Sequence, residues 1–373
     1  MAQVIQEGSV EAASLQNLAD FDNDPARTGA PVQRAALESL PVIDISPFVK
    51  GGSTDERLRV AMELRRACVD IGFFYLVGHG IPDEELDESI RWGHRLFELP
   101  KEELAKLHKD NNRYGLGFVP AGGTQPGEDR APDTREVFSM TRERLPGEDS
   151  NPRNWAGHSQ WPDERLLPGY KAFMQRHIEK RIALAHQVLE AFALSLGLPA
   201  NGFEASHAHL TCNLVYNYYP ALDPAKIDRT QWGISPHTDY GTFTLLWQDD
   251  NGGLEIRNAA GDWIPAPPME GAFVVNIGDL FARWTNDVYI STLHRAVNYG
   301  RGARISLPLF VIPRQDVQVE CIETCRSEQN PARYEPVQAG EYVRQLIEQS
   351  RRTGRAGIST QAASRFKAQE KAQ

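Results

Sequence analysis

The chain has 373 residues, 41% of them apolar and 24% charged, which is typical of a globular protein with one large domain or two modest ones. Its formal net charge of −10 argues against a nucleic-acid or anionic-membrane surface, and it contains neither an apolar run long enough to span a membrane nor an apolar leader typical of secretion. Its four cysteines form no C-x-x-C pair, which indicates reduced thiols in a cytoplasmic protein.

The first part of the chain is predicted to be an arm followed by a region of helices and a few strands. Residues 1–38 are polar and lack periodicity, which is typical of a flexible arm. In the region 39–200, the longest helix is expected from about Leu167 to Leu196, where apolar residues recur every three or four positions and can support a sheet. Other elements expected here are strands at Leu40–Ile45 and Gly72–Val77, a helix from Thr54 or Asp55 to Asp70, and helices that begin at Asp83 and Pro100.

The region 201–315 has a different texture, with short apolar stretches separated by turn residues. Asp250–Gly253 and Ala260–Asp262 are typical hairpin turns, and several evenly spaced strands predict a closed or sandwiched β unit. The remaining segment, 316–373, is expected to contain helices and a tail with six Lys/Arg against one Glu from Ser350 onward. Strands are expected at Leu214–Tyr219, Phe243–Trp247, Leu254–Arg257, Phe273–Ile277, His294–Val297 and Arg304–Ile312.

A His-x-Asp pair precedes one of these strands and indicates a metal site. If the chain is extended there, His237 and Asp239 project from one face, and an imidazole beside a carboxylate suits a borderline divalent metal. Two ligands do not hold such a metal, and His294 is the candidate third ligand, 57 residues later (294 − 237). Two histidines and one carboxylate on one face leave open positions, as in non-haem Fe(II) oxygenases.

A second polar pair lies on the last predicted strand. Arg304 and Ser306 alternate with Ile305 and Leu307, so they share one strand face, and a regular strand places Phe310 on that face as well. The other histidines considered as ligands are interpreted as structural or superficial. His79 lies between two glycines in a turn, and His94, His177 and His186 each stand alone in a helical pattern. His207 and His209 have the spacing of a ligand pair, but no carboxylate and Arg-x-Ser arrangement follows them.

These motifs, together with three further segments, resemble the Fe(II)/2-oxoglutarate-dependent dioxygenases of the isopenicillin N synthase-like family. The further segments are Pro41–Asp44, Gly72–Gly80 and Asn217–Pro220, and the similarity extends from about Leu40 to Pro313. The resemblance implies an α+β fold with a double-stranded β-helix (jelly-roll) core at 201–315, flanked by N-terminal helices and supported by the long helix.

The resemblance also implies the cofactors and the site. His237, Asp239 and His294 would bind Fe(II); 2-oxoglutarate would be the co-substrate, O₂ the oxidant and ascorbate an optional reductant. Arg304 and Ser306 would bind the far carboxylate of 2-oxoglutarate, and Tyr219 and Asn217 match positions that contact it. Long loops often serve a binding site, and residues 113–135 match the mouth of the family's active site. Substrate contacts are therefore expected from Arg113, Tyr114 and Phe118 of this loop. Phe310 is a candidate because it shares the strand face of Arg304, and Phe243, Leu245 and Trp284 are further candidates whose alternative place is the core.

The sequence leaves the substrate and three alternatives open. We expect a small organic metabolite that is hydroxylated, desaturated or cyclised while 2-oxoglutarate is converted to succinate and CO₂. An oxidase of the isopenicillin N synthase or aminocyclopropane-carboxylate oxidase type, which uses no 2-oxoglutarate, would share the same motifs. A catalytically silent binding protein would not need the intact triad, and a zinc hydrolase would require a general base that Tyr240, next to Asp239, does not provide.

Overall fold

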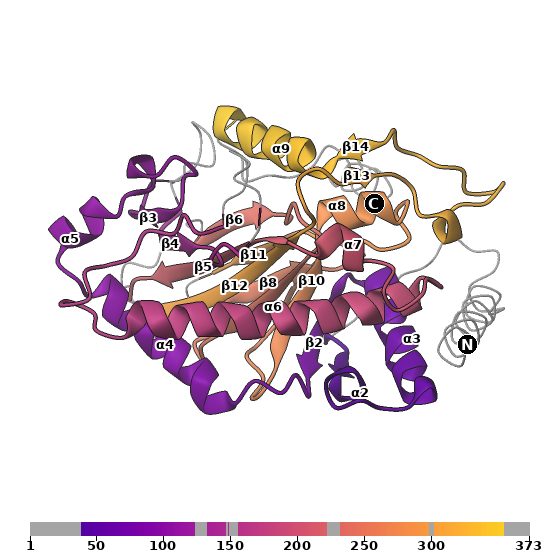
Figure 1. Ribbon diagram of the computed structural model, residues 1–373, viewed down its shortest axis with the longest axis horizontal. Coiled ribbons are helices and arrows are strands. Elements are labelled where there is room, and N and C mark those ends of the chain that lie inside the picture. The colour runs from indigo at the N-terminus through magenta and orange to yellow at the C-terminus, as the bar shows by residue number, and fades with distance from the viewer. Residues whose placement is uncertain are drawn as a thin grey trace.

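A computed structural model describes residues 39–123, 133–146, 148, 156–221, 232–297 and 302–353. Within these ranges the strands form an eight-stranded sheet, a four-stranded sheet and a small two-stranded pair. The predicted arm at 1–38 and the basic tail beyond residue 353 lie outside the described residues. The arrangement is the α+β jelly-roll that the sequence predicts, and Figure 1 shows its sheets beside a long helix.

The large sheet contains strands from both the first and the second half of the chain. Its order is β1-β2-β10-β7-β12-β5-β4-β3; β1 and β2 run parallel and the other pairs antiparallel. The strands before and after residue 200 therefore build one structure. Their bounds are β1 Val42–Asp44, β2 Phe73–Val77, β3 Gly117–Val119, β4 Glu136–Met140, β5 Thr211–Tyr219, β7 Phe243–Gln248, β10 Phe273–Ile277 and β12 Arg304–Ile312.

The small sheet carries both histidines of the predicted metal site. Its order is β6-β11-β8-β9, with all neighbours antiparallel, and the bounds are β6 Ile234–His237, β8 Leu254–Arg257, β9 Trp263–Pro265 and β11 His294–Ala296. Pro236 lies within β6, which is tolerated because β6 is an edge strand. This proline also explains why the sequence did not predict β6 as a strand.

A layer of helices covers the outer face of the large sheet. The longest, α6 (Tyr170–Ser195), runs across this face in Figure 1 and begins at the turn made by Gly169, which has a φ of +84°. Arg181 of α6 is fully buried and donates hydrogen bonds to the carbonyl oxygens of Leu245 and Leu307, which joins the helix to β7 and β12. The long helix therefore supports the sheet, as predicted.

Two further helices belong to this layer, because α3 (Thr54–Asp70) contacts β1, β2 and α6, and α4 (Asp83–Phe97) contacts β5, β12 and α6. Helix α3 packs against α6 and begins with a capping box, in which Ser53 accepts a hydrogen bond from the backbone of Glu56 and the Glu56 side chain bonds back to Ser53. The remaining bounds are α2 Ser46–Val49, α3 Thr54–Asp70, α4 Asp83–Phe97, α5 Lys101–Lys106, α7 Glu204–His207, α8 Asp279–Trp284 and α9 Ala339–Thr353, with 3-10 turns at Lys109–Asn111 and Glu323–Cys325 and the strand pair β13 Gln318–Val319 and β14 Val337–Gln338.

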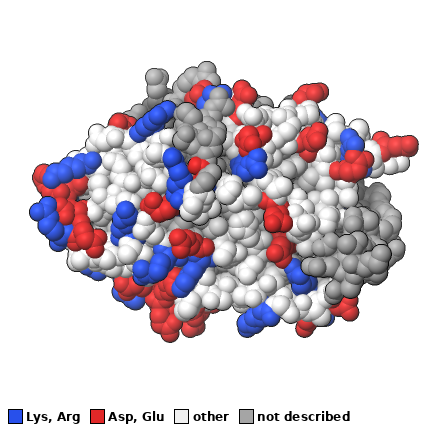
Figure 2. Space-filling model, in the orientation of Figure 1, with Lys and Arg blue, Asp and Glu red and all other residues white. Residues whose placement is uncertain are grey.

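Charged side chains of both signs are interspersed on the face drawn in Figure 2. Several form ion pairs one helical turn apart, for example Arg91 with Glu88 and Lys106 with Glu103. No helix among the described residues is long and apolar enough to cross a membrane.

Candidate metal centre

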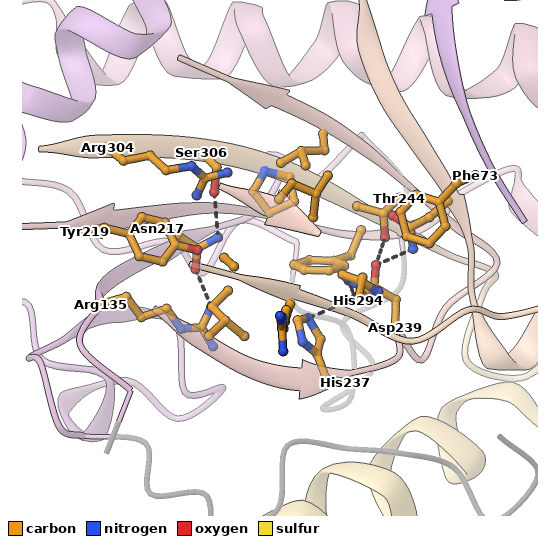
Figure 3. Close-up of a pocket in the computed structure, with 18 residues that line it drawn as sticks. Phe73, Arg135, Asn217, Tyr219, His237, Asp239, Thr244, His294, Arg304 and Ser306 are labelled. Atoms are coloured by element: carbon orange, nitrogen blue, oxygen red, sulfur yellow. Dashed lines mark hydrogen bonds and ion pairs between the residues drawn. The ribbon is translucent and has the colours of Figure 1, made fainter. Parts of the chain in front are cut away.

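Three side chains with metal-binding atoms converge between the two sheets. His237 ends β6 and lies directly opposite His294 of β11, so the two imidazoles are neighbours with ring centroids 4.2 Å apart. Asp239 follows two residues after His237, beyond the end of the strand, and its Oδ1 lies 3.9 Å from Nε2 of His237 and 3.8 Å from Nε2 of His294. The structure therefore brings together the three residues that the sequence singled out (Figure 3).

Backbone hydrogen bonds orient both imidazoles toward the shared point. Nδ1 of His237 lies 2.9 Å from the carbonyl oxygen of Ser235, and Nδ1 of His294 lies 3.1 Å from that of Thr292. Each Nδ1–H therefore donates to a carbonyl, which leaves the Nε2 lone pair free for a metal. Burial, together with the neighbouring His294, lowers the pKa of His237 below its ordinary value, which favours the neutral ring that a metal requires.

The carboxylate of Asp239 is fixed by two side chains of the large sheet. Its Oδ2 accepts a hydrogen bond from Thr244 Oγ1 at 2.5 Å and another from Asn276 Nδ2 at 2.7 Å, while its Oδ1 faces the imidazoles. Thr244 and Asn276 are direct cross-strand partners on β7 and β10. Burial raises the pKa of Asp239, but the two histidines and these two hydrogen bonds outweigh burial and leave the pKa below its ordinary value.

This donor set fits a divalent iron. One ligating atom from each residue lies within 4.8 Å of the others, and two neutral imidazoles with one carboxylate on a single face form the arrangement typical of non-haem Fe(II) oxygenases. The open side faces a cavity between the sheets. The cavity is lined by Phe73, Arg135, Asn217, Tyr219, Ile234, His237, Asp239, Thr244, Leu246, Leu254, Asn276, His294, Arg295, Ala296, Arg304, Ser306, Pro308 and Phe310.

At the far end of this cavity lies a buried cation, the guanidinium of Arg304, that forms no ion pair with a described carboxylate. Arg304 is 3% exposed, and its Nη2 donates to Gln248 Oε1 at 2.9 Å, but its Nε and Nη1 have no hydrogen-bond partner within the described part of the chain. Its guanidinium lies 4.7 Å from the ring centroid of Tyr219, whose hydroxyl is also unpartnered there. Buried donors left unpaired are costly, so this end of the cavity is suited to an anion.

The other co-substrate contacts expected from the sequence lie beside Arg304. Ser306 is on the same strand face, and its Oγ is 3.5 Å from Nδ2 of Asn217, its cross-strand neighbour on β5. The Oδ1 of Asn217 in turn accepts a hydrogen bond from Arg135, which directly precedes β4. Arg135 was not predicted from the sequence, because nothing local links it to a residue 82 positions away.

The chain matches two families, one after the other. Residues 40–164 match the family described as "non-haem dioxygenase in morphine synthesis N-terminal", and residues 210–313 match the "2OG-Fe(II) oxygenase superfamily". The "2-oxoglutarate-Fe(II) type oxidoreductase ppzC" of Metarhizium majus is 33% identical over 355 residues, which is 90% of this chain and 94% of the relative. The chain belongs to the 2-oxoglutarate–Fe(II) oxygenases.

Relatives with named substrates and solved structures support the same assignment. "Homoarginine-6-hydroxylase 2-ODD-C23" of Glycine max is 33% identical over 79% of this chain and 91% of its own length. The crystal structure of a full-length Neurospora crassa protein in complex with alpha-KG is 29% identical, with a TM-score of 0.74, over 83% of this chain and 96% of that one. The oxygenase is therefore a 2-oxoglutarate-dependent dioxygenase of the isopenicillin N synthase-like superfamily that uses Fe(II) and O₂, and this favours 2-oxoglutarate use over the oxidase alternative.

The predicted substrate contacts fall on different sides of the molecule, and only Phe310 of that set lines the cavity of the oxygenase. Phe243 and Leu245 point to the opposite face of β7 and pack in the core, because the side chains of a strand alternate and Thr244 and Leu246 take the inner face. Trp284 lies in α8 and packs against Phe203. The expectation that these three side chains contact substrate is corrected accordingly.

The loop at residues 113–135 was expected to form the mouth of the active site, but its described part contacts other regions of the protein. Arg113 and Tyr114 line a separate groove beside α9, with Tyr114 stacked on His158, and Phe118 is buried against Phe97. Residues 124–132 of this loop lie outside the described residues. Two of the histidines interpreted as structural or superficial have protein partners: His79 is hydrogen-bonded to the backbone of Ile81 and Gly271, and the buried His207 is hydrogen-bonded to Thr242.

Proposed function

We propose that His237, Asp239 and His294 hold the Fe(II) of this dioxygenase and that Arg304 binds the far carboxylate of 2-oxoglutarate. The observation that carries the proposal is the buried guanidinium of Arg304 at the end of the cavity that contains the triad, whose Nε and Nη1 have no hydrogen-bond partner among the described residues. A planar guanidinium can donate two parallel hydrogen bonds to a carboxylate, which is stronger than a neutral hydrogen bond. Ser306 and the hydroxyl of Tyr219 add donors, and Asn217 lies beside them.

When bound, Fe(II) with O₂ and 2-oxoglutarate supplies the oxidation, which yields succinate, CO₂ and an oxidised substrate. The protein contributes ligation, orientation and a dry site. Thr244 and Asn276 hold Asp239 ionised with one oxygen toward the metal, and the carbonyl oxygens of Ser235 and Thr292 hold the two imidazoles in the ligating tautomer. Apolar side chains exclude water on the substrate side of the cavity, namely Phe73, Leu246, Leu254 and Phe310.

The primary substrate in this proposal is a small organic metabolite, not a nucleic acid or a membrane lipid, and the location is the cytoplasm. The cavity beside the triad and the names of the relatives, which include a homoarginine hydroxylase, support a small molecule. The division of the chain predicted from the sequence is kept in this proposal. Residues 201–315 carry the metal and co-substrate ligands, whereas residues 39–200 and 316–373 support them.

The experiment that tests the proposal is anaerobic reconstitution with Fe(II) and 2-oxoglutarate, followed by visible spectroscopy for the charge-transfer band of the chelate. We expect the band in the wild type and in the surface control Arg91→Gln, no band in His237→Ala, and a band that needs much more 2-oxoglutarate in Arg304→Ala. Succinate formation is measured in parallel. A wild-type protein that binds iron but shows neither the band nor succinate would overturn the assignment.

A further inference from the structure

The cavity is lined by a second guanidinium, that of Arg135, which is not among the residues expected to contact the co-substrate. Arg135 donates from Nη1 to Asn217 Oδ1, and its Nε is buried without a hydrogen-bond partner within the described residues (Figure 3). It forms no ion pair within those residues. The nearest acids in sequence are engaged elsewhere, because Asp133 accepts hydrogen bonds from the backbone and hydroxyl of Ser235, and Glu136 pairs with Lys101.

The cavity's charges leave Arg135 uncompensated once the cofactors are bound. Fe(II) and the 2-oxoglutarate dianion cancel each other, and the carboxylate of Asp239 balances Arg304. The third guanidinium of the lining, Arg295, is already neutralised by an ion pair with Glu255 at 2.5 Å. Among the described residues of the lining, one positive charge therefore remains on Arg135, which is partly buried, and an accompanying anion stabilises a charge that has lost part of its hydration.

The strand order separates this charge from the co-substrate end. Arg304 is paired with Tyr219, and the pairing of Glu136 with Tyr218 places Arg135 on the other side of Tyr219. Two strand spacings, about 10 Å, therefore lie between the backbones of Arg135 and Arg304. The carboxylate that Arg304 binds is for this reason not the natural partner of Arg135.

We propose that Arg135 binds a carboxylate of the primary substrate and thereby selects small organic acids with an apolar body. The apolar body is indicated by the rest of the open lining, which includes Phe73, Leu246 and Phe310. The Nε–H of Arg135 is free to donate, while its Nη1 is fixed by Asn217, so the guanidinium is oriented before the substrate arrives. This inference rests on the proposed function and names the substrate class of the same site.

The test compares a matched acid and amide on the full chain loaded anaerobically with Fe(II) and saturating 2-oxoglutarate. Binding of 3-phenylpropanoate and of 3-phenylpropanamide is measured by calorimetry in the wild type, Arg135→Gln, Arg135→Lys and the exposed control Arg91→Gln. We expect the wild type and the control to prefer the acid by about tenfold or more, which is the scale of one charge-assisted hydrogen bond. Arg135→Gln should lose the preference, and Arg135→Lys should keep part of it because the charge remains without the planar fork.

The charge-transfer band separates failure of this inference from failure of the proposed function. Unchanged 2-oxoglutarate affinity in Arg135→Gln shows that this variant is folded and that its co-substrate end is intact. Equal binding of acid and amide by the wild type, including binding of neither, overturns the inference while the band is present. Weakened 2-oxoglutarate binding in Arg135→Gln also overturns it, because Arg135 would then position Asn217 for the co-substrate. Absence of the band from the wild type would refute the proposed function and, with it, this inference.

Discussion

The hydrogen bond from Asn276 to Asp239 predicts that a residue outside the ligand set controls the affinity for iron. Asn276 is 3% exposed and lies on β10, and its Nδ2 donates to the Oδ2 of Asp239 at 2.7 Å. Replacement by leucine preserves the size of the side chain but removes the donor. A hydrogen bond to a charged group contributes roughly 1.5–3 kcal/mol, so we expect Fe(II) to bind about 10- to 100-fold more weakly to Asn276→Leu.

The assay is an anaerobic calorimetric titration of the apo-protein with Fe(II), with circular dichroism to confirm that the variant is folded. Gln248→Leu is the matched control, since it removes a buried amide from the adjacent strand β7 that contacts Arg304 and not Asp239. The control should keep its affinity for Fe(II) and change its affinity for 2-oxoglutarate. If Asn276→Leu binds Fe(II) as tightly as the wild type, the second oxygen of Asp239 does not need its partner, and the reasoning is wrong.

Three further predictions concern the co-substrate, the pH dependence and the backbone. Arg304→Met should raise the 2-oxoglutarate dissociation constant roughly 10- to 100-fold without changing Fe(II) affinity, as followed by the charge-transfer band; an unchanged constant would place the co-substrate elsewhere. Burial lowers the pKa of His207 to about 3, so between pH 6.5 and 3 the unfolded chain binds a proton that the native apo-protein does not. This residue should therefore lower the free energy of unfolding by up to about 1.4 kcal/mol for each unit by which the pH falls. Urea titrations of His207→Gln at several pH values should show a shallower dependence of the free energy of unfolding on pH, and a dependence identical to that of the wild type would refute this. Gly72 has a φ of +70°, and an added Cβ would lie 2.1 Å from the carbonyl oxygen of Ile290. Gly72→Ala should destabilise the protein by about 1–3 kcal/mol or more in urea unfolding, whereas tolerance would mean that the strand can shift.

The parts of the site that could be predicted from the sequence are those in which polar and apolar residues alternate regularly within one strand. Arg304, Ser306 and Phe310 alternate with apolar residues on one strand, so their common face follows from strand geometry alone. His237 and Asp239 are close in sequence, although the strand ends at His237 and the turn that follows places Asp239. The large sheet and its long helix also follow from regular patterns, and the observed bounds of α6, β8, β10 and β12 match or nearly match the prediction.

The parts that could not be predicted depend on pairing between distant strands. Asn276 reaches Asp239 across 37 positions, and Arg135 reaches Asn217 across 82. A single sequence contains no signal for such contacts, because any polar residue of a strand could face solvent or a cavity. The misplacement of Phe243 has the same origin, since a shift of one residue reverses the face of every side chain in a strand. Trp284 was misjudged because α8, with six residues, is too short to show a helical period.

The proposed metal and co-substrate ligands come from two different sheets, so binding of iron and 2-oxoglutarate would affect the stability of the protein in the cell. His237 and His294 belong to the small sheet, whereas Arg304 and the residues that hold Asp239 belong to the large one. Iron and 2-oxoglutarate would thus connect the two sheets, and they stabilise only the folded state, by about 2.7 kcal/mol at a ligand concentration one hundred times the dissociation constant. Cellular proteases act mainly on unfolded chains, so a stability change of this size alters protein abundance several-fold. Iron starvation is therefore expected to lower the amount of this enzyme through degradation, in addition to abolishing its activity.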